Sequence, residues 1–392
     1  MAEKTTSWQA TLQTALERRR QAHSLRTIAP VAEGMVDFSS NDYLGLARDA
    51  QLLEQAHAKV MELRPFRGGA TGSRLLSGTH AYMCEVEDKL ASIFDAEACL
   101  VFNSGYQANT ALLATIPQRG DTILCDELIH ASLREGARLS FAEHFYFRHN
   151  DLNDLERRLQ KARGNCFVVV ESVYSMDGDL APLKEMLDLC EQYGASMIVD
   201  EAHSTGLWGK RGEGILHAEG LHQHPALMAR VYTFGKAIGG HGACVAGSRL
   251  LIDYLLNFAR AFIYTTALPL HSFAYIEAAF NKLAATPPAL QERLWQLVHH
   301  YRQKLQQAQA LTDLHFWHTH SPIQIVEVGG NQRTRALAHH LQQQGLDVRA
   351  VLAPTVPEGK ERLRICLHAF NTLDEVNTLF ECFYSWNNKT SL

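Results

Sequence analysis

Short apolar runs alternate with stretches of helical periodicity from about residue 80 to residue 246. Residues 98–102 are continuously apolar, and the segment before them has apolar side chains at the spacing of one helix face, at Met83, Val86, Leu90 and Ile93. The same alternation predicts strands at 122–125, 145–147, 166–170, 195–199, 231–234 and 243–246, and helices from 105, over 151–162 and over 182–193. Such alternation predicts an α/β fold with a mostly parallel central sheet and helices on both faces.

A second and smaller set of strands follows two long helical stretches, 270–285 and 288–312. Its strands are expected at 323–326, 347–348 and 363–366, with helices at 331–344 and 372–385. We therefore predict an N-terminal helix and arm over 1–45, a large domain over 46–285 and a smaller C-terminal α/β domain over 286–392. Pro287 and Pro288 mark the entry to the leading helix of the smaller domain.

The segment 7–23 has its own helical pattern, with arginines beyond an apolar face made by Trp8, Leu12, Ala15 and Leu16. This pattern predicts an amphipathic helix. We expect it to lie against the main body of the protein or against a partner subunit.

Composition narrows the class of protein. Of the 392 residues, 46% are hydrophobic and 20% are charged, as in soluble globular enzymes, and the formal net charge of -5 gives no reason to expect nucleic acid as a partner. Residues 1–8 lack the basic start and apolar stretch of a targeting signal, and no run approaches the about 20 apolar residues of a membrane span. We expect a cytoplasmic protein with no membrane partner.

Eight cysteines and twenty histidines raise the question of disulfides and metal sites. No two cysteines have CxxC spacing, and several lie in apolar runs such as 166–170, so reduced and buried thiols are expected. The pair His222 and His224 lacks further ligands at useful spacing, so no metal site is predicted.

Two segments carry the candidate chemistry, Val199-Asp-Glu-Ala-His-Ser-Thr-Gly206 and Thr233-Phe-Gly-Lys-Ala-Ile-Gly-Gly240. Asp200 follows the apolar run 195–199, so it is expected at the carboxyl end of a strand, where open α/β sheets bind ligands. Pyridoxal phosphate needs a carboxylate that keeps its ring nitrogen protonated, and Asp200 fits that role. His203, just past the turn, can donate a hydrogen bond to the phenolic oxygen of the cofactor.

Lys236 lies in a loop whose glycines, Gly235, Gly239 and Gly240, leave the backbone unhindered, as a Schiff-base lysine requires. Taken singly, the three residues have plainer interpretations: a helix-capping aspartate, a core histidine and a surface lysine. Because each follows a strand-like run, together they favour the cofactor site.

Five further segments have recognisable sequences: Phe38-Ser-Ser-Asn-Asp-Tyr-Leu-Gly45, Gly72-Ser-Arg-Leu-Leu-Ser-Gly78, Ser175-Met-Asp-Gly178, Phe262-Ile-Tyr-Thr-Thr-Ala-Leu-Pro269, and Pro354-Thr-Val-Pro357 followed by Arg362-Leu-Arg364. With these segments the whole chain resembles the α-oxoamine synthases, pyridoxal-phosphate enzymes of the fold-type-I aminotransferase superfamily, and most of all their biotin-pathway members. The resemblance implies a fold-type-I transferase, pyridoxal 5'-phosphate held as a Schiff base to Lys236, and a homodimer with its active site at the subunit interface.

The resemblance also assigns cofactor contacts. The predicted helix from 105 begins after Ser104, a plain N-cap, and its amides and dipole can hold the cofactor phosphate. Gly105 and Tyr106 match the residues that hold it in the family. Thr233 matches a further phosphate ligand, and Thr265 or Thr266 a position that reaches the phosphate from the neighbouring subunit; for these threonines, strand residues with satisfied hydroxyls are the plainer interpretation. His130 matches a residue that contacts the cofactor ring, and Ser175 matches a residue that contacts the cofactor and substrate region. For His130, a core or helix-start histidine is the simpler explanation.

Substrate carboxylates call for arginine, because a guanidinium matches a carboxylate with two hydrogen bonds. The candidate for the amino-acid carboxylate is Arg364. By position in the family, the other substrate contacts are Arg26, Asn41, Ser73, His130 and Thr355. One departure stands out, since Asn371 occupies a position where the family often has histidine, and we expect altered hydrogen bonding or an altered acyl pocket there.

The activity that the resemblance implies is a decarboxylating condensation of L-alanine with a pimeloyl thioester of coenzyme A or of a carrier protein. Lys236 is expected to remove the α-proton. Three alternatives remain: another α-oxoamine synthase that uses a different amino acid and acyl group, an aminotransferase, and a binding protein that kept the fold and lost the chemistry. A nicotinamide enzyme is disfavoured because no GxGxxG follows an early strand.

Overall fold

A computed structural model describes residues 7–28, 30, 33–285 and 288–390, without the side chains of 387–390. The chain forms two compact units. The large unit comprises Asn41–Ser175 and Asp179–Leu294, and the small unit comprises the described residues up to Ser40, the stretch Met176–Gly178 and the residues from Trp295 on. The main divisions between the units therefore lie at 40/41 and 294/295. The three domains predicted from the sequence, 1–45, 46–285 and 286–392, stay a prediction. Of the two prolines expected at the entry to the smaller domain, Pro287 lies outside the described residues.

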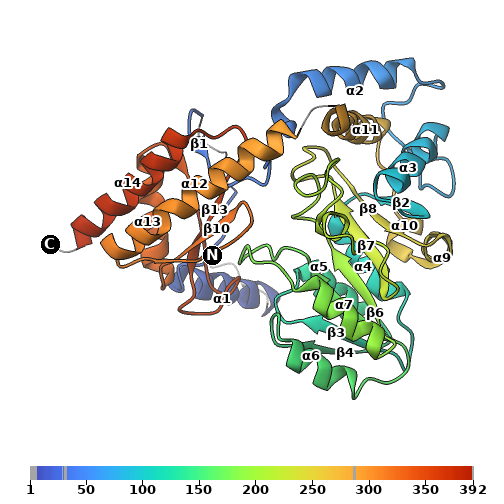
Figure 1. Cartoon of the computed structure of the whole chain (residues 1–392), viewed down its shortest axis with the longest axis horizontal. Coiled ribbons are helices and arrows are strands. Elements are labelled where there is room, and N and C mark those ends of the chain that lie inside the picture. Colours follow the sequence, from blue (N-terminus) through green and yellow to red (C-terminus); the bar gives the residue numbers. More distant parts are fainter. Residues whose placement is uncertain (1–6, 29, 31–32, 286–287, 391–392) are drawn as a thin grey trace, which may run out of the picture. The chain divides into compact units, whose positions relative to one another are not determined.

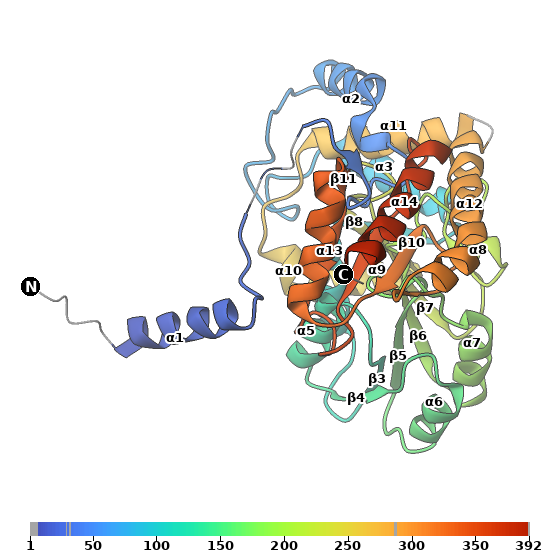
Figure 2. The ribbon, with the colours of Figure 1, turned by 90° about the vertical axis from the view of Figure 1, so that its left-hand side faces the viewer.

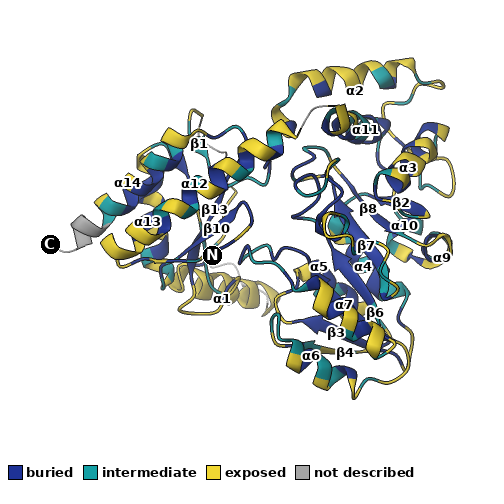
Figure 3. Ribbon diagram, viewed as in Figure 1, coloured by how far each residue is buried: buried dark blue, intermediate teal, exposed yellow. Residues whose placement is uncertain are grey.

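The large unit is built on a sheet of seven strands in the order β2-β8-β7-β6-β5-β3-β4 (Figure 1). Its strands are β2 Ala98–Phe102, β3 Thr122–Asp126, β4 Glu143–Phe147, β5 Cys166–Glu171, β6 Ser196–Asp200, β7 Leu227–Thr233 and β8 Ala243–Gly247. Only β8 runs antiparallel to its neighbours, β2 and β7. All residues of β2, β3 and β5 are buried, as expected of continuous apolar strands covered on both faces (Figure 3).

Helices cover this sheet on both sides, which confirms the predicted α/β architecture. Helices α6 Leu152–Leu159 and α7 Leu183–Gln192 lie on one side of β3, β5 and β6, and α5 Ala131–Leu139 lies on the other (Figure 2). The rest of the unit is helical: α2 Ala50–Glu62, α3 Ala81–Ile93, α4 Gly105–Thr115, α8 Ile215–Ala218, α9 Arg249–Phe258, α10 Arg260–Ile263 and α11 Leu270–Ala285, with the short 3-10 helix Leu46–Arg48. Helix α12, Ala289–Leu311, begins in the large unit and ends in the small one.

The small unit has an antiparallel sheet in the order β12-β13-β10-β9, formed by Arg349–Val351, Arg362–Cys366, Ile323–Glu327 and His315–Phe316. A parallel pair joins β1, Val36–Asp37, to β11, Leu346–Asp347. Besides α1 (Ser7–Gln21) and most of α12, its helices include α13 Asn331–Gln343 and α14 Leu373–Thr390. Within the part of the chain that the structure describes, every helix is too short or too polar to cross a bilayer.

The predicted N-terminal helix is present as α1, Ser7–Gln21, but none of its residues is buried. Trp8, Leu12 and Leu16 expose 62%, 56% and 46% of their surfaces. The small unit therefore does not bury this apolar face. The expectation that it lies against the main body of the protein or against a partner subunit stays a prediction.

Candidate active site

Asp200 is the last residue of β6 and lies at the carboxyl end of the sheet, as predicted. The carboxylate is buried, and two donors fix its orientation. The Asn109 side-chain amide on α4 donates to Oδ2 at 2.7 Å, and the backbone N–H of Ala202 donates to Oδ1 at 2.9 Å. Because each oxygen already accepts one hydrogen bond, the direction from which a further donor can approach the Asp200 carboxylate is fixed.

His203 and Lys236 meet each other in the same unit. The Lys236 Nζ lies 2.9 Å from His203 Nε2, and the Tyr43 hydroxyl lies 2.8 Å from His203 Nδ1. His203 is only 4% exposed, so its ring is fixed between a phenol and an amine. The loop from Asn41 to Tyr43 is joined to this group, since the Tyr43 hydroxyl also donates to Asn41 Oδ1 at 3.1 Å.

One of the three glycines near Lys236 is required by the local backbone. Gly239 has a φ of +71°, and a Cβ on it would lie 2.3 Å from the backbone nitrogen of Ala47. Its N–H donates to the Lys236 carbonyl at 2.8 Å, closing the turn that carries the lysine. Gly235 has open space around it, since a Cβ there would meet nothing nearer than 3.9 Å, and its part in leaving the backbone around Lys236 unhindered stays a prediction.

The N-terminus of α4 lies beside the end of β7. Ser104 caps the helix by accepting from the N–H of Gln107 at 3.2 Å, and a Cβ on Gly105 would lie 3.4 Å from Thr233 Oγ1. Glycine therefore leaves room between the first amides of α4 and the Thr233 hydroxyl. The next residue, Tyr106, is 48% exposed, and its ring centroid lies 6.5 Å from that of His130.

His130 is connected to Asp200 through two uncharged side chains. His130 Nδ1 lies 2.7 Å from Ser132 Oγ, and the Asn109 amide donates to Ser132 Oγ at 2.9 Å as well as to Asp200. The N–H of Ser132 also donates to His130 Nδ1 at 3.2 Å, so the proton of the neutral ring is assigned to Nε2. Burial lowers the pKa of His130, the charge of Lys236 acts in the same direction, and Asp200 opposes them.

Glu171 lies next to Asp200, on the adjacent strand β5. It is 2% exposed and accepts from the N–H of His130 at 2.5 Å. Burial first, and then the charge of Asp200, raises the pKa of Glu171 well above its ordinary value. Burial and the neighbouring aspartate therefore both favour the neutral form of Glu171.

Four residues of this site had no predicted role: Tyr43, Asn109, Ser132 and Glu171. Tyr43 lies inside the segment 38–45 that the sequence singled out, and Asn109 follows Gly105 by four positions, so both Gly105 and Asn109 lie on one face of α4. That spacing is the signal that points from the helix N-terminus to Asn109. The role of Glu171 depends on the pairing of β5 with β6, which the sequence does not show.

The remaining predicted residues of the large unit surround these side chains less closely. The side-chain amide of Asn103, next to the start of α4, donates to Thr265 Oγ1 at 3.3 Å and to the carbonyl of Thr266 at 2.8 Å. Ser73 lies in a turn in which its carbonyl accepts from the N–H of Gly78 at 2.9 Å. Ser175 is half-buried in the loop after β5.

The other predicted residues belong to the small unit. Arg26 donates to Thr355 Oγ1 at 3.2 Å, although the two are far apart in the sequence. Arg364 on β13 is 9% exposed and lies 2.9 Å from Cys366 Sγ. Its neighbour Arg362 instead pairs with Asp177 at 2.5 Å, so the two arginines of this strand have different tasks.

Asn371 makes the hydrogen bonds of a buried structural residue. Its Oδ1 accepts from the N–H of His368 at 2.9 Å and lies 3.0 Å from His368 Nδ1, while its Nδ2 donates to the Asp37 carbonyl at 3.2 Å. The histidine of this segment is thus three positions earlier, with Nε2 3.0 Å from the carbonyl of Ser40. The expected effect on the acyl pocket of having Asn371 where the family often has histidine stays a prediction.

The large unit holds the set of groups that pyridoxal phosphate needs. A buried carboxylate suits the ring nitrogen, the amine of Lys236 suits the aldehyde, and the imidazole of His203 beside that amine suits the phenolic oxygen. The room between Gly105 and Thr233 at the N-terminus of α4 suits a phosphate. The residues present therefore fit the cofactor.

Comparisons with known proteins agree with this site. The family model described as aminotransferase class I and II matches residues 33–383. The chain is 42% identical to 8-amino-7-oxononanoate synthase of Emericella nidulans, over 96% of this chain and 95% of that protein. Among solved structures, serine palmitoyltransferase from S. paucimobilis with a bound PLP-myriocin adduct has a TM-score of 0.87 at 28% identity, covering 97% of this chain and 98% of the other. An 8-amino-7-oxononanoate synthase from Francisella tularensis has a TM-score of 0.78 at 26% identity, covering 92% and 100%.

Proposed function

The chain belongs to the aminotransferase class I and II family, and within it to the α-oxoamine synthases, and on this premise we propose the reaction that it catalyses. The reaction is the condensation of L-alanine with a pimeloyl thioester to give 8-amino-7-oxononanoate, carbon dioxide and the free thiol of the carrier. This is a step of biotin synthesis. The name of the Emericella nidulans relative, at 42% identity over nearly the whole chain, supports this choice over a serine or glycine substrate.

The cofactor is pyridoxal phosphate, which when bound supplies an electron-withdrawing ring that stabilises negative charge on the α-carbon of the amino acid. The residues that would hold it are Asp200 at the ring nitrogen, His203 at the phenolic oxygen, and Gly105, Tyr106 and Thr233 at the phosphate. Lys236 forms the covalent link.

Proton transfer falls to Lys236. With the cofactor bound, the free Nζ of Lys236 would accept the α-proton of alanine and later return a proton to the same carbon. His203 Nε2, at 2.9 Å, is the neighbour that holds this amine in place. Asp200 keeps a proton on the ring nitrogen, and the Asn109 amide and the Ala202 N–H keep its carboxylate aligned for that purpose.

The carbon–carbon bond forms between the α-carbon of alanine and the thioester carbonyl, and the carbon–sulfur bond breaks with its electron pair leaving on the thiolate. The carboxylate of alanine then leaves as carbon dioxide. His130 in its neutral form has Nδ1 engaged with Ser132, so it presents the Nε2 proton to the substrate. Arg364 is assigned to the carboxylate of the amino acid, and Arg26 with Thr355 to the acyl substrate.

The observation that carries this proposal is the contact of Lys236 with His203, which in turn contacts Tyr43, beside the buried Asp200. The test is Lys236→Ala. We expect it to abolish release of thiol from pimeloyl-CoA in the presence of L-alanine, while far-UV circular dichroism and the melting temperature stay close to the wild type. Retained turnover in this variant would refute the assignment.

Two further features accompany the proposal. We place the enzyme in the cytoplasm as a homodimer, in which Thr265 or Thr266 of each subunit reaches the phosphate site of the other. Within one chain both threonines contact Asn103, just before α4, and their reach to the other subunit rests on the family resemblance.

A further inference from the structure

After β5 the chain forms a short hairpin, residues 173–180, that contains one of the predicted cofactor residues, Ser175. An isolated antiparallel bridge joins its two ends, and the N–H of Tyr174 donates to the Asp179 carbonyl at 3.0 Å. Ser175 directly follows this paired base, and residues 176–178 form the tip. The position of Ser175 therefore depends on how the base and the tip are held.

Asp179 holds the base of the hairpin in the large unit. Its Oδ2 accepts from the Asn150 side-chain amide at 2.8 Å and lies 2.7 Å from His149 Nε2. The other nitrogen of the same ring lies 2.9 Å from Asp126 at the end of β3. The base is thus tied to the sheet whose strand β6 ends at Asp200.

A buried ion pair holds the tip inside the small unit, to which residues 176–178 belong. Arg362 Nη1 on β13 lies 2.5 Å from Asp177 Oδ1, and the two residues are 3% and 8% exposed. The guanidinium is itself fixed, because its Nε donates to the Lys360 carbonyl at 2.9 Å and it lies 4.6 Å from the centre of the Trp317 ring. Displacing either partner would leave a buried charge without its counter-ion, so the pair has one defined arrangement.

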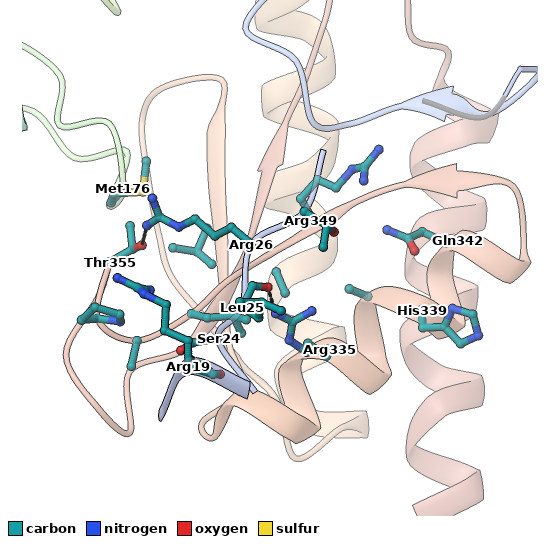
Figure 4. Close-up of a pocket in the computed structure, with 17 residues that line it drawn as sticks. Arg19, Ser24, Leu25, Arg26, Met176, Arg335, His339, Gln342, Arg349 and Thr355 are labelled. Carbon is teal, nitrogen blue, oxygen red and sulfur yellow. Dashed lines mark hydrogen bonds between the residues drawn. The ribbon is translucent and has the colours of Figure 1, made fainter. Parts of the chain in front are cut away.

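The residues on either side of Asp177 also have defined contacts in the small unit. Gly178 has a φ of +72°, and a Cβ on it would lie 2.4 Å from the Ile323 carbonyl oxygen, so the turn requires glycine. Its own carbonyl accepts from the Ser321 hydroxyl at 2.7 Å. Met176 lies beside Thr355, with which it lines one pocket of the small unit (Figure 4).

We infer that Asp177 and Arg362 are positioning residues that place Ser175 for its contact with the cofactor. The inference rests on the proposed function and on the family position of Ser175, which matches a contact of the cofactor and substrate region. Tyr174 is held on one side of Ser175 and Asp177 is held two residues after it, so the short stretch of backbone between them sets the direction of the Ser175 hydroxyl. The ion pair acts through the chain and touches neither cofactor nor substrate.

A role in stability alone is the competing explanation of this ion pair. A buried ion pair often stabilises a protein no more than apolar side chains of similar volume, whereas removing one partner costs several kcal/mol. A loss of stability in a single variant therefore does not distinguish the two roles. The test has to measure stability and the placement of Ser175 separately.

The test is a double-mutant cycle between Asp177→Asn and Ser175→Ala in the cofactor-loaded enzyme. Each single variant should lower kcat about tenfold, the effect of losing roughly one charge-assisted hydrogen bond. In the Ser175→Ala background, Asp177→Asn should have little further effect on kcat or on the absorbance spectrum of the cofactor, because the residue through which it acts is gone. The melting temperature should instead fall by the same amount in both backgrounds.

Hydrogen exchange followed by mass spectrometry gives a readout that does not depend on turnover. Asp177→Asn should speed exchange in the peptide that contains residues 173–180. The double variant Asp177→Asn with Arg362→Gln leaves no unpaired charge, so it should regain part of the protection and part of the kcat. It also keeps the test decisive if Asp177→Asn alone folds poorly.

The matched control is Lys360→Gln, which removes an exposed ion pair with Glu327 next to the same strand β13. It should keep the wild-type kcat, cofactor spectrum and exchange of the hairpin. Multiplicative effects of Asp177→Asn and Ser175→Ala on kcat, or a wild-type kcat in Asp177→Asn despite a lower melting temperature, would overturn the inference. The expected cycle in the cofactor spectrum and the expected exchange, without condensation product even from the wild type, would support the inference and overturn the proposed function.

Discussion

Asp200 and His130 are coupled through two uncharged side chains, because Asn109 donates to both Asp200 and Ser132, and Ser132 contacts His130. Hydrogen bonds in such a buried network strengthen one another, and each group limits the positions of the next. The orientation of the aspartate and the tautomer of the histidine are therefore set together. Asn109 and Ser132 are positioning residues in this account.

We predict that Asn109→Ala lowers kcat about tenfold, since one hydrogen bond to a charged group is worth roughly 1.5 kcal/mol. The absorbance spectrum of the bound cofactor should change, because Asp200 loses one of its two aligning donors, while the KM for L-alanine changes little. Ser132→Ala should instead shift the pH dependence of kcat/KM through His130. The double variant should lose less than the product of the two single effects, because the residues share one network. Strictly multiplicative losses with an unchanged spectrum would contradict the coupling.

Residues of the site were predictable from the sequence where a strand end or a glycine-rich loop marks them, as for Asp200 and Lys236. Asn109 is marked in the sequence only by its spacing of four positions from Gly105. The role of Glu171 was not predictable, because it arises from the pairing of β5 with β6. Continuous apolar runs located the buried strands to within a few residues, whereas α2, α5 and α9 were not predicted. In α5 the buried side chains are mostly small, Ser132, Gly136 and Ala137 beside Leu133, so few large apolar residues mark this helix in the sequence.

At the scale of elements, His149 joins the loops that follow three parallel strands. Its Nδ1 lies 2.9 Å from Asp126 at the end of β3, and its Nε2 lies 2.7 Å from Asp179 in the segment after β5. His149 itself follows β4. Burial alone lowers the pKa of His149, but the hydrogen bonds and charges of Asp126 and Asp179 outweigh it and raise the pKa to about 10. The imidazolium thus holds the loop ends beside the site.

We predict that His149→Gln lowers the free energy of unfolding by about 3 kcal/mol near pH 6, because it leaves the buried carboxylate of Asp126 without its charged partner. A raised folded-state pKa means that the stabilisation is complete below the ordinary histidine pKa of 6.5 and is lost as the pH rises through about 10. Urea unfolding between pH 6 and pH 10 should show the difference between variant and wild type shrinking with pH. The exposed His318→Gln serves as the control, and a difference that stays constant with pH would show that no charge is involved.

At the scale of the whole molecule, several large apolar side chains of the large unit are exposed near the start of α4: Leu75, Leu76, Tyr106 and Tyr264, at 47%, 86%, 48% and 75%. The segments that carry them are joined, since the N–H of Ala267 donates to the Gly72 carbonyl at 2.9 Å and Asn103 donates to the Thr266 carbonyl at 2.8 Å. Clustered exposed apolar side chains mark surfaces that bind another protein. This surface also contains Thr265 and Thr266.

We predict a homodimer through this surface. Light scattering of the wild type should give about twice the chain mass of 43.9 kDa, and the double variant Leu76→Asp with Tyr264→Asp should give the mass of one chain. Its turnover should fall together with the dimer fraction, because Thr265 and Thr266 then no longer reach a neighbouring phosphate site. Leu139→Asp, an exposed leucine on α5, should stay dimeric and active. A fully active monomer would disprove the shared site.

The central claim is the reaction itself, and product mass spectrometry tests it most directly. The cofactor-loaded enzyme is incubated with pimeloyl-CoA and L-alanine labelled with carbon-13 either at the carboxyl carbon or at the methyl carbon, beside a second reaction with glycine and acetyl-CoA. The account predicts 8-amino-7-oxononanoate in the first reaction alone, with the methyl label retained and the carboxyl label released as carbon dioxide. Product only from glycine and acetyl-CoA, or conversion of alanine to pyruvate without condensation, would contradict it.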